Sequence, residues 1–437
     1  MFREILNTIG TKIASAVIAL LILILTTQYL GADGRGLVSL IYSSIGIIGI
    51  FAGFVGGPAV IYLASKHKLI HLLFPVYTWI LLVAIAGSGL IWYLQLVPAI
   101  YVIPVGVLAI TSSVFVVNLY LLVGHRKVEA NNHIYLIQWI INLITLGAFF
   151  IVLNQPEVEY VVLSLFISNI LGIILTIYAL YQLNEPGSFH WKEEFSVIRS
   201  IISVSFFAQA AAIMYYLYYR LGIFVLNFSF GLFAVGVFSV GVNIAEFILL
   251  ASQSLALVGY SRISNTDDRE YAKKITIILT KFGFMLTACI TLIMLVMPSS
   301  VYGLVFGKDF IAVPQVLVTM SPGIVAFGTS IIIFNYFAGV GKNTVNAAAA
   351  FIGLCSNVLL CYLLVPIFGI AGAGISSSVS FIIMSGILFG VFFSETQSKI
   401  GDLMIRRADF IFLLGKLKDY IRSHSSDNNP GARQTFL

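Results

Sequence analysis

The chain alternates long apolar runs with short polar turns along almost its whole length. A helix that crosses a bilayer needs about 20 mostly apolar residues. Twelve runs meet this requirement, so we predict an all-α polytopic membrane protein with about 12 transmembrane helices. The predicted spans are 13–30, 38–64, 70–94, 99–123, 133–153, 160–181, 200–226, 232–258, 275–297, 313–338, 345–365 and 370–393.

The composition excludes a soluble protein of this length. Only 10% of the 437 residues are charged and 59% are hydrophobic, whereas about a quarter of a soluble domain is charged. The first apolar run, 13–30, has no small-residue cleavage site after it, so we expect it to remain as the first span rather than to be removed as a signal peptide.

The basic residues predict the orientation, because lysine and arginine stay preferentially in cytoplasmic loops. With both termini in the cytoplasm, 20 of the 24 basic residues fall in the N-terminal segment, the inner loops and the C-terminal tail. The outer loops hold only Arg35 and Lys308. This split supports an even number of spans, and it explains the net charge of +6 without a nucleic-acid partner.

Four regions follow from these spans: an N-terminal six-helix lobe over 1–182, a cytoplasmic linker over 183–199, a C-terminal six-helix lobe over 200–393 and a cytoplasmic tail over 394–437. Between Lys399 and Arg422 the tail has an apolar face at helical spacing, which predicts a helix on the membrane surface or an ordinary exposed tail helix. We expect the polar end of the tail to be disordered.

Two short matches indicate that the lobes are repeats of one another, as in many transporters. At an offset of 200 residues, Gly31, Gly36 and Ser39 match Gly231, Gly236 and Ser239. At an offset of 217 residues, Gly124, Val128 and Ala130 match Gly341, Val345 and Ala347. We therefore predict two pseudo-symmetric lobes around a central cavity.

Three ionisable residues, Arg220, Glu246 and Lys281, lie inside predicted spans, where charge is costly and usually functional. Counted from the span ends at about 1.5 Å per residue, they lie at successive depths. This spacing predicts charges stepped across the bilayer rather than one ion pair. Lys281 also has an alternative role, because its long side chain could reach back to the cytoplasmic surface.

Polar or small residues form stripes on three spans. The stripes comprise Ser205, Gln209, Tyr216 and Arg220 on the seventh span, Ser239, Asn243, Glu246 and Gln253 on the eighth, and Ser39, Ser43, Gly46 and Gly53 on the second. A central aqueous cavity lined by spans one, two, seven and eight would explain them. The alternative is a packing seam, because Gly49, Gly53 and Gly57 repeat every four residues.

The residues before Arg220 include Tyr215, Tyr216, Tyr218 and Tyr219. Tyrosine is typical of the membrane interface, and we assign that position to all of them except Tyr216. No phosphate-binding loop, nucleophile triad, paired carboxylates or metal-spaced His/Cys cluster is present in the sequence. We therefore predict no enzyme, no metal site and no cofactor.

The chain resembles the oligosaccharide flippases (Wzx-type) of bacterial polysaccharide export, in the superfamily that also contains multidrug exporters and the lipid II flippase. The resemblance covers essentially the whole chain. Its carriers are YLGADGRG at 29–36, RLGIFV at 220–225 followed by Gly231 and VGVFS at 235–239, VYGLVFGKDF at 301–310 and PIFGIAGAG at 366–374. Each is a turn-and-packing pattern, and they identify the family only in combination and order.

The resemblance implies a monomeric flippase of the bacterial cytoplasmic membrane. Its expected partners are the membrane lipids and the polymerase of the same pathway. Its substrate would be an undecaprenyl-diphosphate-linked oligosaccharide for O-antigen of lipopolysaccharide, capsule or exopolysaccharide. Alternating access would carry it from the inner to the outer leaflet. Because arginine binds phosphate oxygens in a bidentate manner, Arg220 is the first candidate for the diphosphate and Lys281 the second. Glu246 would position Arg220 or carry a coupling ion.

Two other functions remain open. A cation-coupled multidrug exporter of the same superfamily typically carries an acidic residue in its first span, and 13–30 has none. A polysaccharide polymerase or ligase, which is an enzyme, tends to have a large outer loop rich in arginine and histidine. The longest outer loop here, 298–312, has one lysine and no histidine.

Overall fold

The computed structural model describes residues 2–57, 59–64, 69–183 and 191–404, and the regular structure in these ranges is helical. Its elements are α1 (Phe2–Gly56), α2 (Ala59–Ala64), α3 (Leu69–Tyr93), α4 (Ala99–Gly124), α5 (Val128–Gly147), the π-helix η1 (Ala148–Val152), α6 (Val158–Tyr181), α7 (Trp191–Ile263), α8 (Arg269–Val296), α9 (Ser299–Phe306), the 3₁₀-helix η2 (Lys308–Ala312), α10 (Val313–Gly339), α11 (Asn343–Thr396) and the 3₁₀-helix η3 (Ile400–Leu403).

Within the described ranges, nine helical stretches are long and apolar enough to cross a membrane. Three helices, α1, α7 and α11, contain 55, 73 and 54 residues. At about 1.5 Å per residue, even the shortest is more than twice the thickness of a bilayer core. Each is interrupted by one glycine with non-helical backbone angles, Gly31, Gly231 or Gly369, and therefore supplies two spans. The predicted twelve spans are confirmed.

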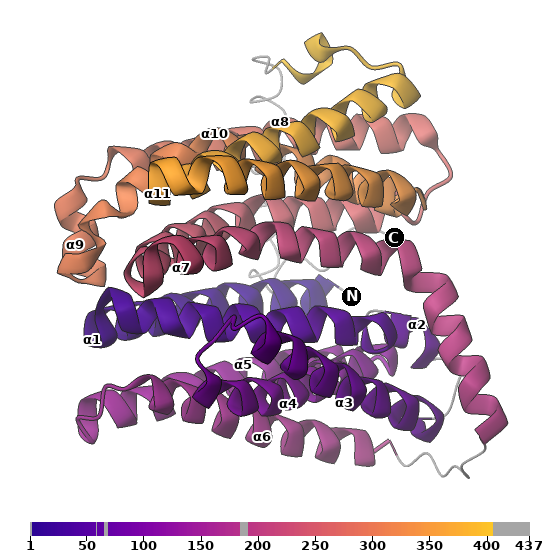
Figure 1. Ribbon diagram of the computed structural model, residues 1–437. Coiled ribbons are helices and arrows are strands. Elements are labelled where there is room, and N and C mark those ends of the chain that lie inside the picture. The colour runs from indigo at the N-terminus through magenta and orange to yellow at the C-terminus, as the bar shows by residue number, and fades with distance from the viewer. Residues whose placement is uncertain (1, 58, 65–68, 184–190, 405–437) are drawn as a thin grey trace, which may run out of the picture.

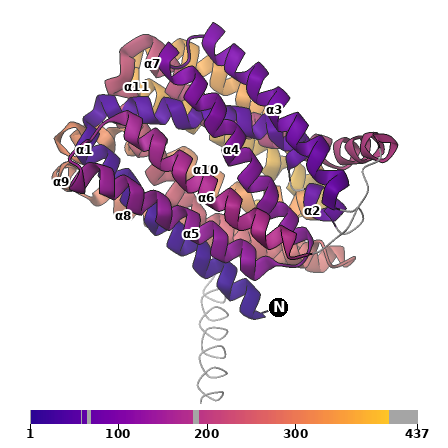
Figure 2. The ribbon, with the colours of Figure 1, turned by 90° about the horizontal axis from the view of Figure 1, so that it is seen from below.

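The chain is a multi-pass membrane protein. Figure 1 shows the helices side by side, with α1 to α6 in the lower layer and α7 to α11 in the upper layer. Viewed from below, α3 and α4 lie on one side of the lower layer, and α5 and α6 lie on the other (Figure 2). Apolar side chains such as Ile103 and Val152 are 77% exposed, as expected for surfaces that face lipid.

We call the end of the bundle where α1, α7 and α11 turn back the kink end; it lies at the left of Figure 1. Here the two halves meet through reciprocal backbone contacts. A Cβ on Gly36 would lie 2.1 Å from the carbonyl oxygen of Leu232, and a Cβ on Gly236 would lie 2.0 Å from that of Ala32. Gly36 and Gly236 are 200 residues apart, and so are Ala32 and Leu232. An approximate two-fold axis therefore relates the halves at this joint.

The second predicted match was shifted by two residues. Lys127 and Lys342 each donate their backbone N–H to the carbonyl five residues earlier, at 2.8 Å. The residues before them, Arg126 and Gly341, have φ angles of 61° and 79°. The turns therefore correspond at an offset of 215 residues, not 217. The sequence match aligned Gly124 with Gly341 because both are glycines. In the structure, Arg126 occupies the left-handed position that Gly341 occupies in the other half.

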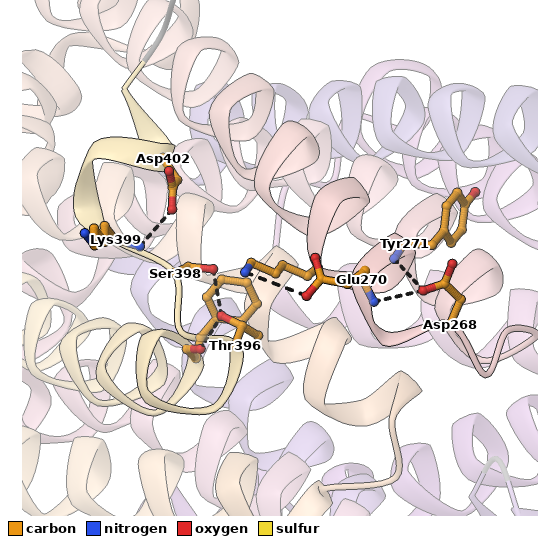
Figure 3. A network of polar contacts seen from close by, with 9 residues as sticks. Asp268, Glu270, Tyr271, Thr396, Ser398, Lys399 and Asp402 are labelled. Atoms are coloured by element: carbon orange, nitrogen blue, oxygen red, sulfur yellow. Dashed lines mark hydrogen bonds and ion pairs between the residues drawn. The ribbon is translucent and has the colours of Figure 1, made fainter.

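At the opposite end, the carboxylate of Asp268 caps α8 by accepting the backbone N–H groups of Glu270 and Tyr271, each at 3.0 Å (Figure 3). Lys342, at the start of α11, and Glu395, near its end, form an ion pair of 2.7 Å. This pair joins the first and last turns of one helix, which shows that α11 is a hairpin folded at its glycine.

The predicted linker over 183–199 is helical from Trp191 onward, because α7 begins there. The predicted surface helix in the tail lies mostly outside the described residues. In the described part of the tail, the short helix η3 is capped by the carboxylate of Asp402, which accepts the N–H of Lys399 at 2.8 Å (Figure 3).

Candidate functional site

Arg220 and Glu246 on α7 form an ion pair, whereas the sequence predicted separate charges stepped across the bilayer. Nη2 of Arg220 lies 2.8 Å from Oε1 of Glu246. Arg220 precedes the turn at Gly231 by 11 residues and Glu246 follows it by 15. The two Cα atoms therefore differ in depth by about 6 Å, which the arginine side chain can span. The predicted separation was wrong because the depths were counted from span ends rather than from the shared turn.

The ion pair is not sealed in the core. The side chains of Arg220 and Glu246 are 21% and 36% exposed. Because lipid tolerates charge poorly, we expect this exposed side to face a water-filled space between the halves.

Tyr216 connects the pair to the other half of the protein. The guanidinium carbon of Arg220 lies 5.8 Å from the centre of the Tyr216 ring, a favourable distance for a cation–π contact. The Tyr216 hydroxyl donates to the backbone carbonyl of Ser43 on α1 at 3.2 Å. Only glycine at position 46 leaves room for this arrangement, since a Cβ there would lie 1.8 Å from the hydroxyl oxygen.

Arg35 belongs to the same site, although the distribution of basic residues predicted an outer-loop position for it. It is 5% exposed, and its Nη1 donates to Oγ1 of Thr26 at 3.1 Å. Its Nε is buried without a hydrogen-bond partner in the described structure. Arg35 interacts electrostatically with Arg220 and Glu246. The site therefore combines two guanidinium groups with one carboxylate, which is paired with Arg220, and it carries a net positive charge.

A signal for Arg35 was present in the sequence. It precedes Ser39 by four residues, and Ser39 precedes Ser43 by four. Extending that stripe by one helical turn reaches Arg35. The helix of α1 resumes directly after Gly31, so Arg35 faces the interior of the bundle.

The other predicted site residues are in different places. Ser39 and Ser43 are buried on α1, 5% and 2% exposed, and Gln209 donates from Nε2 to the carbonyl of Ile50 at 2.7 Å. A Cβ on Gly53 would lie 2.6 Å from that Nε2. In this stretch the stripes of α1 and α7 pack against each other. This is the packing seam that the sequence offered as the alternative to an aqueous cavity.

Three other predicted residues lie in the same half. Asn243 donates to the carbonyl of Ser239 in its own helix at 2.6 Å. Gln253 is exposed, and Lys281 lies on α8 with 8% of its surface exposed. Burial in the bundle excludes a surface position for Lys281 in this structure. The side chain of Ser205 lies outside the described part of the chain.

The interface assignment of the tyrosines was wrong. Tyr218 is 2% exposed, and its hydroxyl donates to the carbonyl of Ser377 at 2.7 Å. Its ring packs edge-on against Phe381 at 4.6 Å, and Tyr215 stacks on Phe327 at 5.5 Å. The first segment of α7 is packed against α10 and α11, so these rings face protein instead of the membrane surface.

Comparison with solved structures identifies the fold. A lipid II flippase MurJ in an inward closed conformation has a TM-score of 0.69 and 15% identity, and the match covers 90% of this chain and 89% of that chain. An inward-facing multidrug resistance MATE transporter of the MOP superfamily has a TM-score of 0.66 and 15% identity, covering 88% and 94%. A point mutant of the Vibrio cholerae MATE transporter VcmN gives 0.62 and 15%, covering 92% and 96%.

The sequence comparisons are sparser. No protein-family model matches the chain. A curated protein of Haloferax volcanii, named "Probable low-salt glycan biosynthesis flippase Agl15", is 23% identical over 241 residues. The match covers 54% of this chain and 49% of that protein, so the chain spans about half the length of this relative.

Proposed function

We propose that this protein is a flippase of the MOP superfamily that moves a polyprenyl-diphosphate-linked oligosaccharide across the cytoplasmic membrane by alternating access. The observation that carries the proposal is an excess of positive charge between the halves: Arg220 is paired with Glu246, whereas the buried Arg35 has no carboxylate partner in the described structure. A buried cation is costly unless an anion compensates it. A diphosphate bound between the halves would supply this anion, and arginine binds phosphate oxygens well.

Other features support the same proposal. The two halves meet as pseudo-repeats at Gly36 and Gly236, an arrangement suited to rocking one half against the other. The basic loops favour cytoplasmic termini. Within the proposal, the lobes are 1–182 and 200–393, and transport runs from the inner to the outer leaflet. The Haloferax volcanii relative is named as a glycan biosynthesis flippase. The protein would perform no covalent chemistry itself and would supply a polysaccharide polymerase with substrate.

The test is a strain that lacks the gene, complemented with the native protein or with Arg35→Ala, Arg220→Ala or the control Arg262→Ala, an exposed arginine on the same helix. A flippase predicts loss of surface polysaccharide and accumulation of single lipid-linked units on the inner leaflet in the deletion strain. The two site variants should reproduce this defect, and the control should restore export. Accumulation on the outer leaflet would contradict the proposal and indicate a polymerase.

The similarity to MATE transporters favours a second candidate, a cation-coupled multidrug exporter. It predicts unchanged surface polysaccharide and new sensitivity to cationic drugs in the same deletion strain. The net positive site argues against a cationic substrate, because like charges repel at short range.

A further inference from the structure

A cavity of about 530 Å³ opens at the kink end between the two halves. The turn between α3 and α4 contributes Trp92, Tyr93 and Gln95, and the turning region of α7 contributes Asn227 and Leu232. Ligand pockets usually have volumes of about 300–1,000 Å³. The cavity is therefore large enough to hold a ligand in the seam that must open for transport.

The symmetry-related position in the other half is filled by protein. There α9 and η2, which connect α8 to α10, cover the turn of α1. Gln28 donates from Nε2 to the carbonyls of Leu304 and Val305 at 2.9 and 2.8 Å. The backbone N–H of Ala32 donates to the carboxylate of Asp309 at 3.0 Å.

The offset of 200 residues relates this filled groove to the open one. Ala32 corresponds to Leu232, and Thr27, which lies beside Gly307, corresponds to Asn227. The connection between α3 and α4 covers only 94–98, whereas the connection between α8 and α10 covers 297–312. The short connection leaves the groove on α7 open, so among the described residues the cavity lies on this side of the joint and the equivalent position is filled.

The lining indicates the class of ligand. Trp92 and Tyr93 present rings that are 63% and 77% exposed, and Gln95 and Asn227 present amide groups that both donate and accept hydrogen bonds. None of the residues that line the cavity is charged. Amphipathic rings beside neutral amides suit an uncharged, hydroxyl-rich ligand, namely a sugar.

We propose that this cavity binds the sugar head of the lipid-linked substrate on its way out of the protein. Asn227 follows Arg220 by seven residues, about 10 Å along the helix. A diphosphate at Arg220 would thus place the attached sugars toward the cavity. This inference rests on the proposed function, and it identifies a second binding site within it.

The experiment uses the full chain in lipid nanodiscs, with Trp92 as the sole tryptophan after Trp79, Trp139 and Trp191 are changed to phenylalanine. Two probes are titrated, a polyprenyl diphosphate that carries a trisaccharide and the same lipid without sugar. Fluorescence of Trp92 reports on the cavity, and displacement of a radiolabelled form of the sugar-free lipid reports on the diphosphate site.

We expect only the sugar-bearing lipid to change the Trp92 fluorescence and to bind more tightly than the bare lipid. Gln95→Ala and Asn227→Ala should each weaken its binding about 2- to 10-fold, as for loss of one or two hydrogen bonds, and leave the bare lipid unaffected. Tyr93→Ala should act in the same direction. The control is Tyr362→Ala, because Tyr362 is also 77% exposed but lies on α11, away from the cavity.

Binding of both lipids with equal affinity and no sugar-specific fluorescence change would overturn the cavity as a sugar site and leave the proposed function intact. The aromatic residues would then be ordinary membrane-interface residues. If neither lipid binds, the proposed function and this inference both fail. A native-like elution profile and melting temperature would exclude misfolding of the variants as the cause of lost binding.

Discussion

Replacing Gly36 or Gly236 by alanine should disfavour closure of the kink end. The added Cβ would lie 2.1 or 2.0 Å from a carbonyl oxygen of the other half, whereas non-bonded atoms pack at about 3.5 Å. A carbonyl group cannot avoid the clash by changing rotamer, so the halves must separate by about 1 Å or more.

The expected cost can be set against ordinary overpacking, which destabilises a packed state by about 1–3 kcal/mol. Because the cost falls only on the closed state, the ratio of closed to open molecules should drop about 5- to 150-fold. The open ensemble should still form, since neither glycine contacts the other half once the kink end has opened.

Distances between nitroxide labels at Asp33 and Phe233, measured by pulsed electron resonance, would report the opening. Both residues are exposed, and they occupy equivalent positions beside the joint. We expect the distance distribution to shift to longer values in Gly36→Ala and Gly236→Ala, with transport impaired. The matched control is Gly49→Ala on the same helix, where the nearest atom to an added Cβ lies 3.8 Å away. If Gly36→Ala and Gly49→Ala gave the same distances and transport, the joint would not govern closure.

Three further outcomes follow from single contacts. Arg220→Lys should retain part of the transport that Arg220→Ala loses, because lysine keeps the charge but not the bidentate geometry; equal, full activity of both in the complementation assay would remove Arg220 from the site. Tyr218→Phe should lower the free energy of unfolding by about 0.5–1.5 kcal/mol, because it removes one buried hydrogen bond, and a thermal-shift assay with unchanged stability would contradict this. Lys342→Ala should cost at most about 1 kcal/mol, because its pair with Glu395 is 45% and 29% exposed, and the loss should shrink in high salt.

The hydropathy of the sequence was sufficient to predict the spans, because a lipid environment requires about 20 apolar residues per crossing and internal backbone hydrogen bonds. The glycines at 31 and 231 were also informative, since both take positive φ angles at the same place in each half. Glycine adopts a positive φ angle without steric cost, so the residue type itself indicates the turn at these two positions. The first trace of the repeat was therefore detectable without any knowledge of packing.

The site could be predicted only in part. Arg220 and Glu246 were recognised as costly charges, but their pairing depends on the turn between two spans, which sets their relative depth. Arg35 was missed because a glycine-rich segment suggests a loop, whereas the helix resumes directly after Gly31. Tyr218 was misplaced because composition cannot distinguish a ring that faces lipid from one that faces Phe381.

The two halves repeat the backbone geometry, but the charged residues of the site have no charged counterparts in the opposite half. Counting from the equivalent glycines, Arg35 corresponds to Val235, Arg220 to Leu20 and Glu246 to Gly46. The two halves have therefore kept a common hinge geometry while only one copy of each position has become ionic. In the proposed flippase, mutations in the charged positions would change what is carried without altering how the halves move. Under this proposal, selectivity and motion are able to evolve independently.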